Sequence, residues 1–260
     1  MSDTPSELPV PAAAAPPAHA DPEPDPSALP QAIAVPASAD MVQSVTILDR
    51  AIKQRRDSDI TLVNWWLYFL FLSWITFGIY TIYLFFKRIG RIDRFSERKH
   101  AYYIALLDWT ERYAQQQGRE DSVHHQLADL RSNVQNAYVG ALRPIKAGLS
   151  FVLTILTLGI YGIYVHYRMN RYWWDAQVLE QDFDDSLSQA WMKVDLMRYP
   201  ISFEVDQSKR RSFALYFILS IVTFGIWGLV WDHKFHTDPD NLYPPFHTVE
   251  DTVLQTVRAH

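Results

Sequence analysis

The sequence predicts an all-α membrane protein in which three repeated apolar units are joined by amphipathic helices. Three observations lead to this fold class: long apolar stretches, one short motif that recurs in each of them, and helical periodicity in the polar segments between them. The stretches are residues 62–86, 148–165 and 213–231, and none contains Asp, Glu, Lys, Arg or His. A run of about 18 or more uncharged apolar residues is typical of a membrane segment.

The chain begins with a segment of a different composition. Residues 1–40 hold ten of the 15 prolines, six acidic residues and no Lys or Arg. Such a segment buries too little apolar surface to offset its ordering entropy, so we expect a disordered acidic tail. It lacks the basic start and apolar run of a secretory signal, and we therefore expect it to stay in the cytoplasm. Residues 41–60 follow as a predicted juxtamembrane helix.

The three predicted membrane repeats are residues 61–95, 145–175 and 208–236, and each carries the motif T-x-G-I-aromatic. Glycine allows a backbone turn, and the threonine hydroxyl can bond a backbone group that the turn leaves free. The motif therefore predicts a re-entrant hairpin with arms of roughly 9–12 residues. A single spanning helix, with the glycines as a packing notch, is the alternative. The predicted structural residues are Thr76, Gly78, Tyr80, Thr157, Gly159, Tyr161, Gly162, Thr223, Gly225, Trp227 and Gly228.

The polar connectors, residues 96–144 and 176–207, read as helices with a break at Gly118 after a helix over 101–117. Apolar residues recur in them at spacings of three and four, which makes one stripe along each helix. Such stripes need burial, so we expect self-association into a homo-oligomer or a cytoplasmic helical partner. Pro239 and Pro244-Pro245 predict an interrupted C-terminal tail, residues 237–260, with a short helix over 249–257. The stripe residues are Val123, Leu127, Leu130, Val134, Ala137, Ala141, Leu179, Phe183, Leu187, Ala190, Val194 and Met197.

Cations flank the apolar stretches, and positive residues favour the cytoplasmic side of a membrane. Both connectors are rich in Lys and Arg near the stretches, so we expect both in the cytoplasm, which favours hairpins over single spans. The same cations predict contacts with anionic lipid headgroups and give no reason to expect nucleic acid as a partner. The predicted headgroup contacts are Lys87, Arg88, Arg91, Arg168, Arg171, Lys209, Arg210 and Arg211.

The repeated pattern, with its apolar run, T-[LF]-G-I-[YW]-[GT]-[IL]-Y and following basic residue, resembles a bacterial family of membrane domains of unknown function. Those domains often occur in tandem and are linked by cytoplasmic helices. The middle copy is the closest match, whereas the first departs at Thr81 and the third at Trp227 and Val230. The resemblance implies a protein of the bacterial cytoplasmic (inner) membrane, and it implies no reaction.

Few residues in the sequence suggest chemistry. His233, His236 and Asp238 have a spacing that a zinc site can use, but a juxtamembrane surface explains them more simply. The acidic run Glu180 to Asp185 is expected on the wet face of its helix. We therefore predict no catalytic, cofactor-binding or metal-binding residues and no cofactor. The expected function is a non-enzymatic membrane scaffold or membrane-shaping protein, held from the cytoplasmic face; an oligomeric channel or lipid-moving protein is the alternative.

Overall fold

The computed structural model describes residues 39–77 and 79–260, and every regular element in these ranges is a helix. This confirms the predicted all-α class. The predicted acidic tail, residues 1–40, lies outside the described residues except for its last two, which begin the first helix. The elements are α1 (Ala39–Lys53), α2 (Arg55–Ser58), α3 (Trp65–Leu67), η1 (Tyr68–Leu72), α4 (Ser73–Ile75), α5 (Ile79–Gln116), α6 (Glu120–Val139), α7 (Ala147–Leu156), α8 (Ile160–Lys193), η2 (Gln207–Lys209), α9 (Phe213–Val222) and α10 (Ile226–Ala259).

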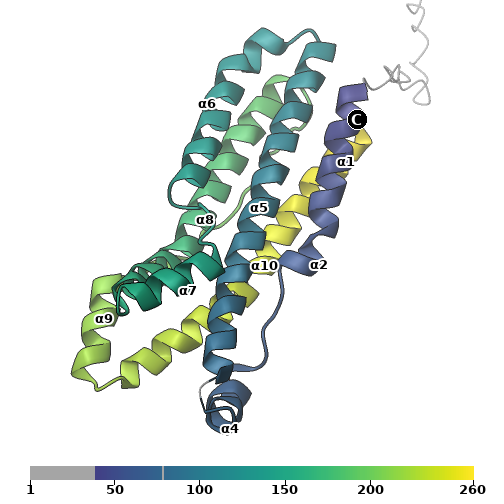
Figure 1. Cartoon of the computed structure of the whole chain (residues 1–260). Helices are drawn as coiled ribbons and strands as arrows, with labels where there is room; N and C mark the ends of the chain where they lie inside the picture. The colour runs from purple at the N-terminus through teal and green to yellow at the C-terminus, as the bar shows by residue number, and fades with distance from the viewer. Residues whose placement is uncertain (1–38, 78) are drawn as a thin grey trace, which may run out of the picture. The chain divides into compact units, whose positions relative to one another are not determined.

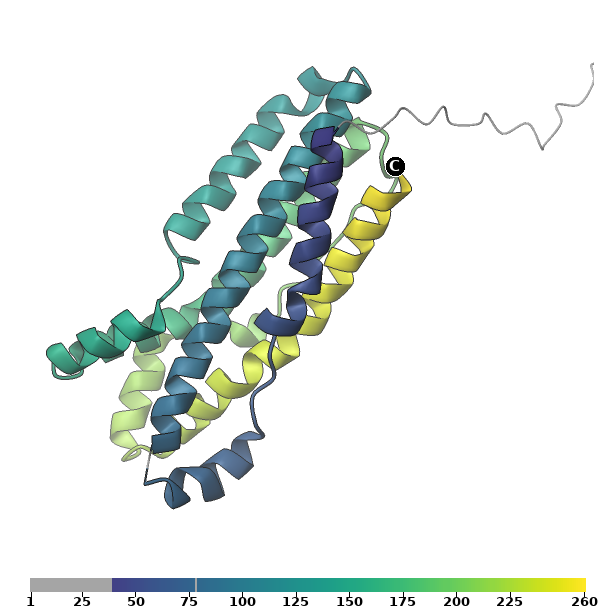
Figure 2. The same ribbon diagram turned by 45° about the vertical axis from the view of Figure 1, so that its right-hand side comes forward.

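The long helices α5, α8 and α10 run in the same direction and form the centre of a bundle (Figure 1). Helix α6 returns antiparallel beside α5 and α8, and α1 packs on α5 and α10. The second view shows α1 and α10 side by side and the α7–α8 hairpin projecting sideways (Figure 2). The predicted break at Gly118 is confirmed, because α5 ends at Gln116 and the φ of Gly118 is +63°.

The apolar stripes of the connectors are buried inside this one chain. Val123, Leu127, Leu130 and Val134 of α6 and the α8 stripe from Leu179 to Ala190 belong to the main hydrophobic core. The exposed fraction of Phe183 and Leu187 is 0%. The stripes therefore find their partners within the chain, and they give no reason to invoke self-association, which stays a prediction.

Each apolar stretch is folded as two helical arms joined by a tight turn at the motif. The breaks fall between α4 and α5, between α7 and α8, and between α9 and α10. Among the described residues, no helix combines the length and the apolar content that crossing a bilayer would require. We call these units hairpin 1 (residues 65–86), hairpin 2 (147–165) and hairpin 3 (213–231).

The second arm of each hairpin continues without a break into the bundle. The predicted start of a separate helix at residue 101 is therefore wrong, because α5 begins at Ile79 and is continuous to Gln116. Neither α5 nor α8 contains a proline, and each further turn of an existing helix adds intrahelical hydrogen bonds at little entropic cost. The hairpins and the bundle are consequently built from the same three long helices.

The expected interruption of the C-terminal tail at its prolines is also wrong, since α10 runs through Pro239, Pro244 and Pro245. Proline lacks the N–H that would bond the carbonyl four residues earlier. Arg91, on α5, replaces the donor that Pro239 lacks. Its Nη2 donates to the Phe235 and His236 carbonyls, each at 3.1 Å, and its Nη1 donates to Asp240 at 3.0 Å.

An ion network lies where α5, α8 and α10 meet. Lys99 Nζ is 2.6 Å from Glu180 of α8 and 3.0 Å from Glu250 of α10, and all three side chains are at most 1% exposed. Glu250 also binds Arg98 at 2.8 Å and Arg55 at 2.7 Å. The acidic run of α8 is therefore not uniformly on the wet face.

Within that run, Glu180 and Asp184 are buried, whereas Asp182 and Asp185 are exposed. Residues four apart share one face of a helix, and this face packs on α5. Burial raises the pKa of Glu180, and Lys99 opposes that effect. Burial, and then Glu180, raise the pKa of Asp184 well above its ordinary value. For Glu250, Lys99, Arg98 and Arg55 outweigh burial and lower the pKa.

Candidate functional site

The motif threonine connects the two arms of each hairpin. In hairpin 2, Thr157 Oγ1 donates to the Leu153 carbonyl at 2.7 Å and accepts the Tyr161 N–H at 2.9 Å. Thr223 makes the same two bonds in hairpin 3, at 2.7 and 2.9 Å, and Thr76 makes them in hairpin 1, at 2.6 and 3.1 Å. One hydroxyl thus satisfies a carbonyl at the end of the first arm and an N–H at the start of the second.

The two residues after the threonine form the turn. Leu158 and Gly159 have φ of 50° and 94°, and Phe224 and Gly225 have φ of 50° and 91°. This left-handed conformation favours glycine, and a bulky side chain adopts it at a cost. Phe77 has φ of 49°, while Gly78 lies outside the described residues. The sequence argument for a turn at this glycine therefore holds in hairpins 2 and 3.

The arms of each hairpin cross at small residues. A Cβ on Gly162 would lie 3.0 Å from Thr154 Cγ2, and a Cβ on Gly228 would lie 3.6 Å from Ser220 Oγ. Hairpin 1 has Thr81 in place of this glycine, and Thr81 lies 3.3 Å from Ser73 Oγ. The small residue three before the motif threonine is a signal that the sequence analysis missed.

The turn residues are also the most exposed apolar side chains of the described chain. The exposed fractions of Phe77, Leu158 and Phe224 are 97%, 95% and 97%. All but five of the exposed large apolar side chains lie in the three hairpins, and these five are Val42, Val139, Tyr167, Met192 and Tyr199. The hairpins lie toward the end of the bundle opposite the C-terminus (Figure 1). A concentration of exposed apolar side chains of this size is typical of a site for a membrane or a protein partner.

The eight predicted headgroup cations divide into two groups. Arg88, Arg91, Lys209 and Arg211 are bound within the chain, where Arg88 pairs with Asp232, Arg91 with Asp240, and Lys209 and Arg211 with Asp238. The prediction of lipid contact overlooked these carboxylates, which lie far away in sequence.

The other four cations lie nearer the surface. Lys87 lies over the ring of Tyr83 at 5.4 Å, and Arg210 lies over the ring of Trp174 at 5.7 Å. Arg168 donates to the Arg143 carbonyl at 2.6 Å. Arg171 is 3.2 Å from the carboxylate of Asp175.

Hairpin 1 is attached to α10 through polar contacts. Its core of Trp65, Tyr68 and Leu84 is separate from the main core. Trp65 Nε1 donates to Asp232 at 2.8 Å, and His236 bonds the Val63 carbonyl through Nε2. Burial, followed by the nearby Arg88, lowers the pKa of His236 to about 4, so this imidazole is neutral at pH 7. Nε2 of His236 and the carboxylate of Asp238 are thus engaged by other groups of the chain.

A cavity of about 440 Å³ separates hairpins 2 and 3. Its walls are mostly apolar and include glycines of both hairpins. The lining residues include Gly162, Ile163 and His166 of α8, Phe217 of α9, and Gly228 and Trp231 of α10. Its volume falls in the range of small-molecule pockets, which are about 300–1,000 Å³.

Comparison of the chain with protein-family models, with curated proteins and with solved structures gives no match. The resemblance to a bacterial family of membrane domains stays a prediction.

Proposed function

We propose that the protein is a non-enzymatic membrane scaffold that inserts its three hairpins into one leaflet from the cytoplasmic face. The exposure of Phe77, Leu158 and Phe224 at the hairpin turns carries this proposal. A turn that presents a fully exposed apolar side chain in water leaves that surface unburied, whereas lipid would cover it.

The dimensions of the hairpins fit one leaflet. Helices α7 and α9 have 10 residues each, which corresponds to about 15 Å of helix. That is about half of a hydrocarbon core of ~30 Å. At each turn the threonine hydroxyl supplies an acceptor for one N–H that the break leaves free, which lowers the cost of placing the turn in a bilayer interior.

The surface cations support the same orientation. Lys87 and Arg168 follow the apolar arms of hairpins 1 and 2, where lipid headgroups would lie if the turns were inserted. Each Lys or Arg near an anionic surface contributes roughly 1 kcal/mol. The proposed partners are therefore membrane lipids with anionic headgroups, and insertion of three short hairpins into one leaflet would wedge it and shape the membrane.

Vesicle flotation tests the proposal. The full chain, purified in mild detergent and mixed with vesicles of neutral and anionic phospholipid, should float with the vesicles. The triple variant Phe77→Asp, Leu158→Asp, Phe224→Asp should remain in the dense fraction, because an Asp in the membrane costs roughly 2.5–3.5 kcal/mol. Asp tolerates the left-handed conformation of these turns, so the variant should keep its helical circular dichroism.

A matched control places the same charges elsewhere on the surface. The triple variant Val42→Asp, Val139→Asp, Met192→Asp also removes three exposed apolar side chains, but none lies in a hairpin. It should float like the unmodified chain. Equal flotation of the hairpin variant and the unmodified chain would contradict membrane insertion through the turns.

The cavity between hairpins 2 and 3 favours one second candidate, a lipid-moving protein that holds an acyl chain there. A scaffold should change vesicle shape without exchanging lipid between vesicles. A lipid-moving protein should transfer a fluorescent phospholipid from donor to acceptor vesicles. Release of trapped ions would instead indicate the oligomeric channel that the sequence left open.

A further inference from the structure

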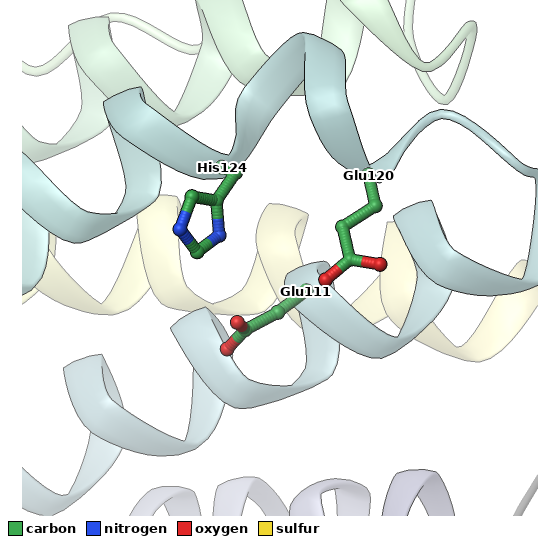
Figure 3. A group of neighbouring side chains, drawn as sticks. All are labelled: Glu111, Glu120 and His124. Carbon is green, nitrogen blue, oxygen red and sulfur yellow. The ribbon is translucent and has the colours of Figure 1, made fainter.

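Far from the hairpins, at the loop end of the α5–α6 pair, three side chains with metal-binding atoms face one another (Figure 3). They are Glu111 of α5 and Glu120 and His124 of α6, and one ligand atom from each lies within 4.8 Å of the others. The antiparallel packing of α5 and α6 brings Glu111 opposite the other two. Glu120 and His124 share one helix face because they are four residues apart.

The other contacts of these side chains leave room for a ligand. Arg131 Nη2 is 3.4 Å from Glu111, but it is only 2.7 Å from Asp108, which is its closer partner. Gln115 donates to Glu120 at 3.2 Å. His124 packs edge-on against His125 with ring centroids 5.7 Å apart, and its ring nitrogens have no hydrogen bond to a described residue. One ligand atom from each of two carboxylates and one imidazole is thus within 4.8 Å of the others, on side chains that are half-buried (Glu111) or exposed (Glu120 and His124).

We propose that Glu111, Glu120 and His124 bind a divalent transition-metal ion of the zinc type. Imidazole and carboxylate together suit Zn²⁺, whereas Mg²⁺ and Ca²⁺ prefer six or more oxygen ligands. Around Zn²⁺, protein N and O ligands lie at about 2.0–2.2 Å, which places them roughly 3.5 Å apart in a tetrahedron. Binding would require rotations of these surface side chains that bring the three atoms from within 4.8 Å to that spacing, with water completing the coordination.

The ion would connect α5 to α6 beside the turn that joins them. This site is independent of membrane insertion, since it lies at the end of the α5–α6 pair away from the hairpin turns. Its consequence would be a bundle whose loop end is more stable when the metal is bound, because a ligand that binds the folded state stabilises it.

Calorimetric titration of the full chain in detergent, after removal of metals with a chelator, tests the site with ZnCl₂ as the probe. The expected result is one site per chain whose affinity is at least about tenfold weaker in His124→Ala and in Glu120→Gln. His125→Ala is the matched control, because it removes the adjacent imidazole on the same helix, and it should leave the affinity unchanged. Excess MgCl₂ should not displace the zinc.

A second measurement reports the bridge between the helices. Zinc should raise the melting temperature of the unmodified chain and leave that of Glu111→Gln unchanged. Absence of zinc binding to the unmodified chain overturns the proposal. So does equal affinity in the unmodified chain and in His124→Ala, which would show an adventitious ion only. Neither result depends on vesicle flotation, so failure here and failure of membrane insertion are separate outcomes.

Discussion

At the scale of single residues, one threonine hydroxyl at each hairpin turn caps two helix ends, the end of the first arm and the start of the second. It donates to the end of one arm and accepts from the start of the next. The accepted N–H is the backbone N–H four positions after the threonine, and this residue is aromatic in all three copies. The four-residue spacing is the one at which the threonine hydroxyl can accept the backbone N–H at the start of the second arm.

Replacing Thr157 by valine keeps its shape and removes both bonds. We expect the free energy of unfolding to fall by about 1–2 kcal/mol, because the Tyr161 N–H loses its acceptor. Urea denaturation in detergent measures the change. Thr252→Val is the control, because Thr252 also bonds the carbonyl four residues earlier, at 2.9 Å, but lies on exposed α10 surface. An equal effect of both substitutions would show that the turn has no special need for threonine.

His236 makes stability depend on pH. Its pKa is about 4 in the fold and 6.5 as an ordinary value, so the unfolded chain binds more protons between these limits. The contribution of neutral His236 is therefore fully present above pH 6.5 and is lost as the pH falls toward 4. His236→Gln can still donate to the Val63 carbonyl, and it should flatten the slope of unfolding free energy against pH in this window. An unchanged slope would contradict the assignment, which also involves the neighbouring Arg88, Arg91 and Asp232.

At the scale of elements, each long helix serves two environments. Its first turns form the second arm of an apolar hairpin, and the rest packs in a bundle with buried charges. One charged residue from each of α5, α8 and α10 meets in the pairs Lys99–Glu180 and Lys99–Glu250. Buried ion pairs add little net stability compared with apolar packing, but an unpaired buried charge is costly. The network therefore penalises any slip of one long helix along another.

Lys99→Met should lower the free energy of unfolding by roughly 3–5 kcal/mol, because Glu180 loses its ion partner while remaining buried. Chemical denaturation checks this value. Adding Glu180→Gln to Lys99→Met should recover part of the loss, since the second substitution removes the uncompensated charge. Lys193→Met serves as the exposed control, and its effect should be small. Strict additivity of the two network substitutions would show that they are not coupled.

At the scale of the whole described chain, apolar and polar surfaces are separated. The hairpins carry nearly all of the exposed large apolar side chains. The bundle contains both polar connectors, which we predict to lie in the cytoplasm. If the hairpins enter from one face, both connectors must lie on that same face. Such an arrangement would follow from the turns at the three motifs.

Single cysteines test the arrangement, because the chain has none of its own. Gln117→Cys at the α5–α6 turn and Gln207→Cys before α9 lie on different connectors, and both positions are exposed. An impermeant thiol reagent should label both in inside-out membrane vesicles and neither in intact bacterial cells. Labelling of either position in intact cells would mean that one connector lies outside and would contradict insertion from one side.

The helical class, the three apolar units and the break at Gly118 could be predicted from the sequence, because they depend on composition, periodicity and backbone preference near each residue. The sequence favoured a turn at each motif but left a single spanning helix as the alternative, and the turns of hairpins 2 and 3 are seen in the structure. Only the tertiary structure decided which charges are buried and which helices continue. Arg91 bonds the carbonyl that Pro239 leaves without a donor, and Lys99 pairs with the buried Glu180. In both contacts the two residues are at least 80 positions apart in the sequence. A local pattern holds no information about a partner that arrives only when the long helices pack side by side.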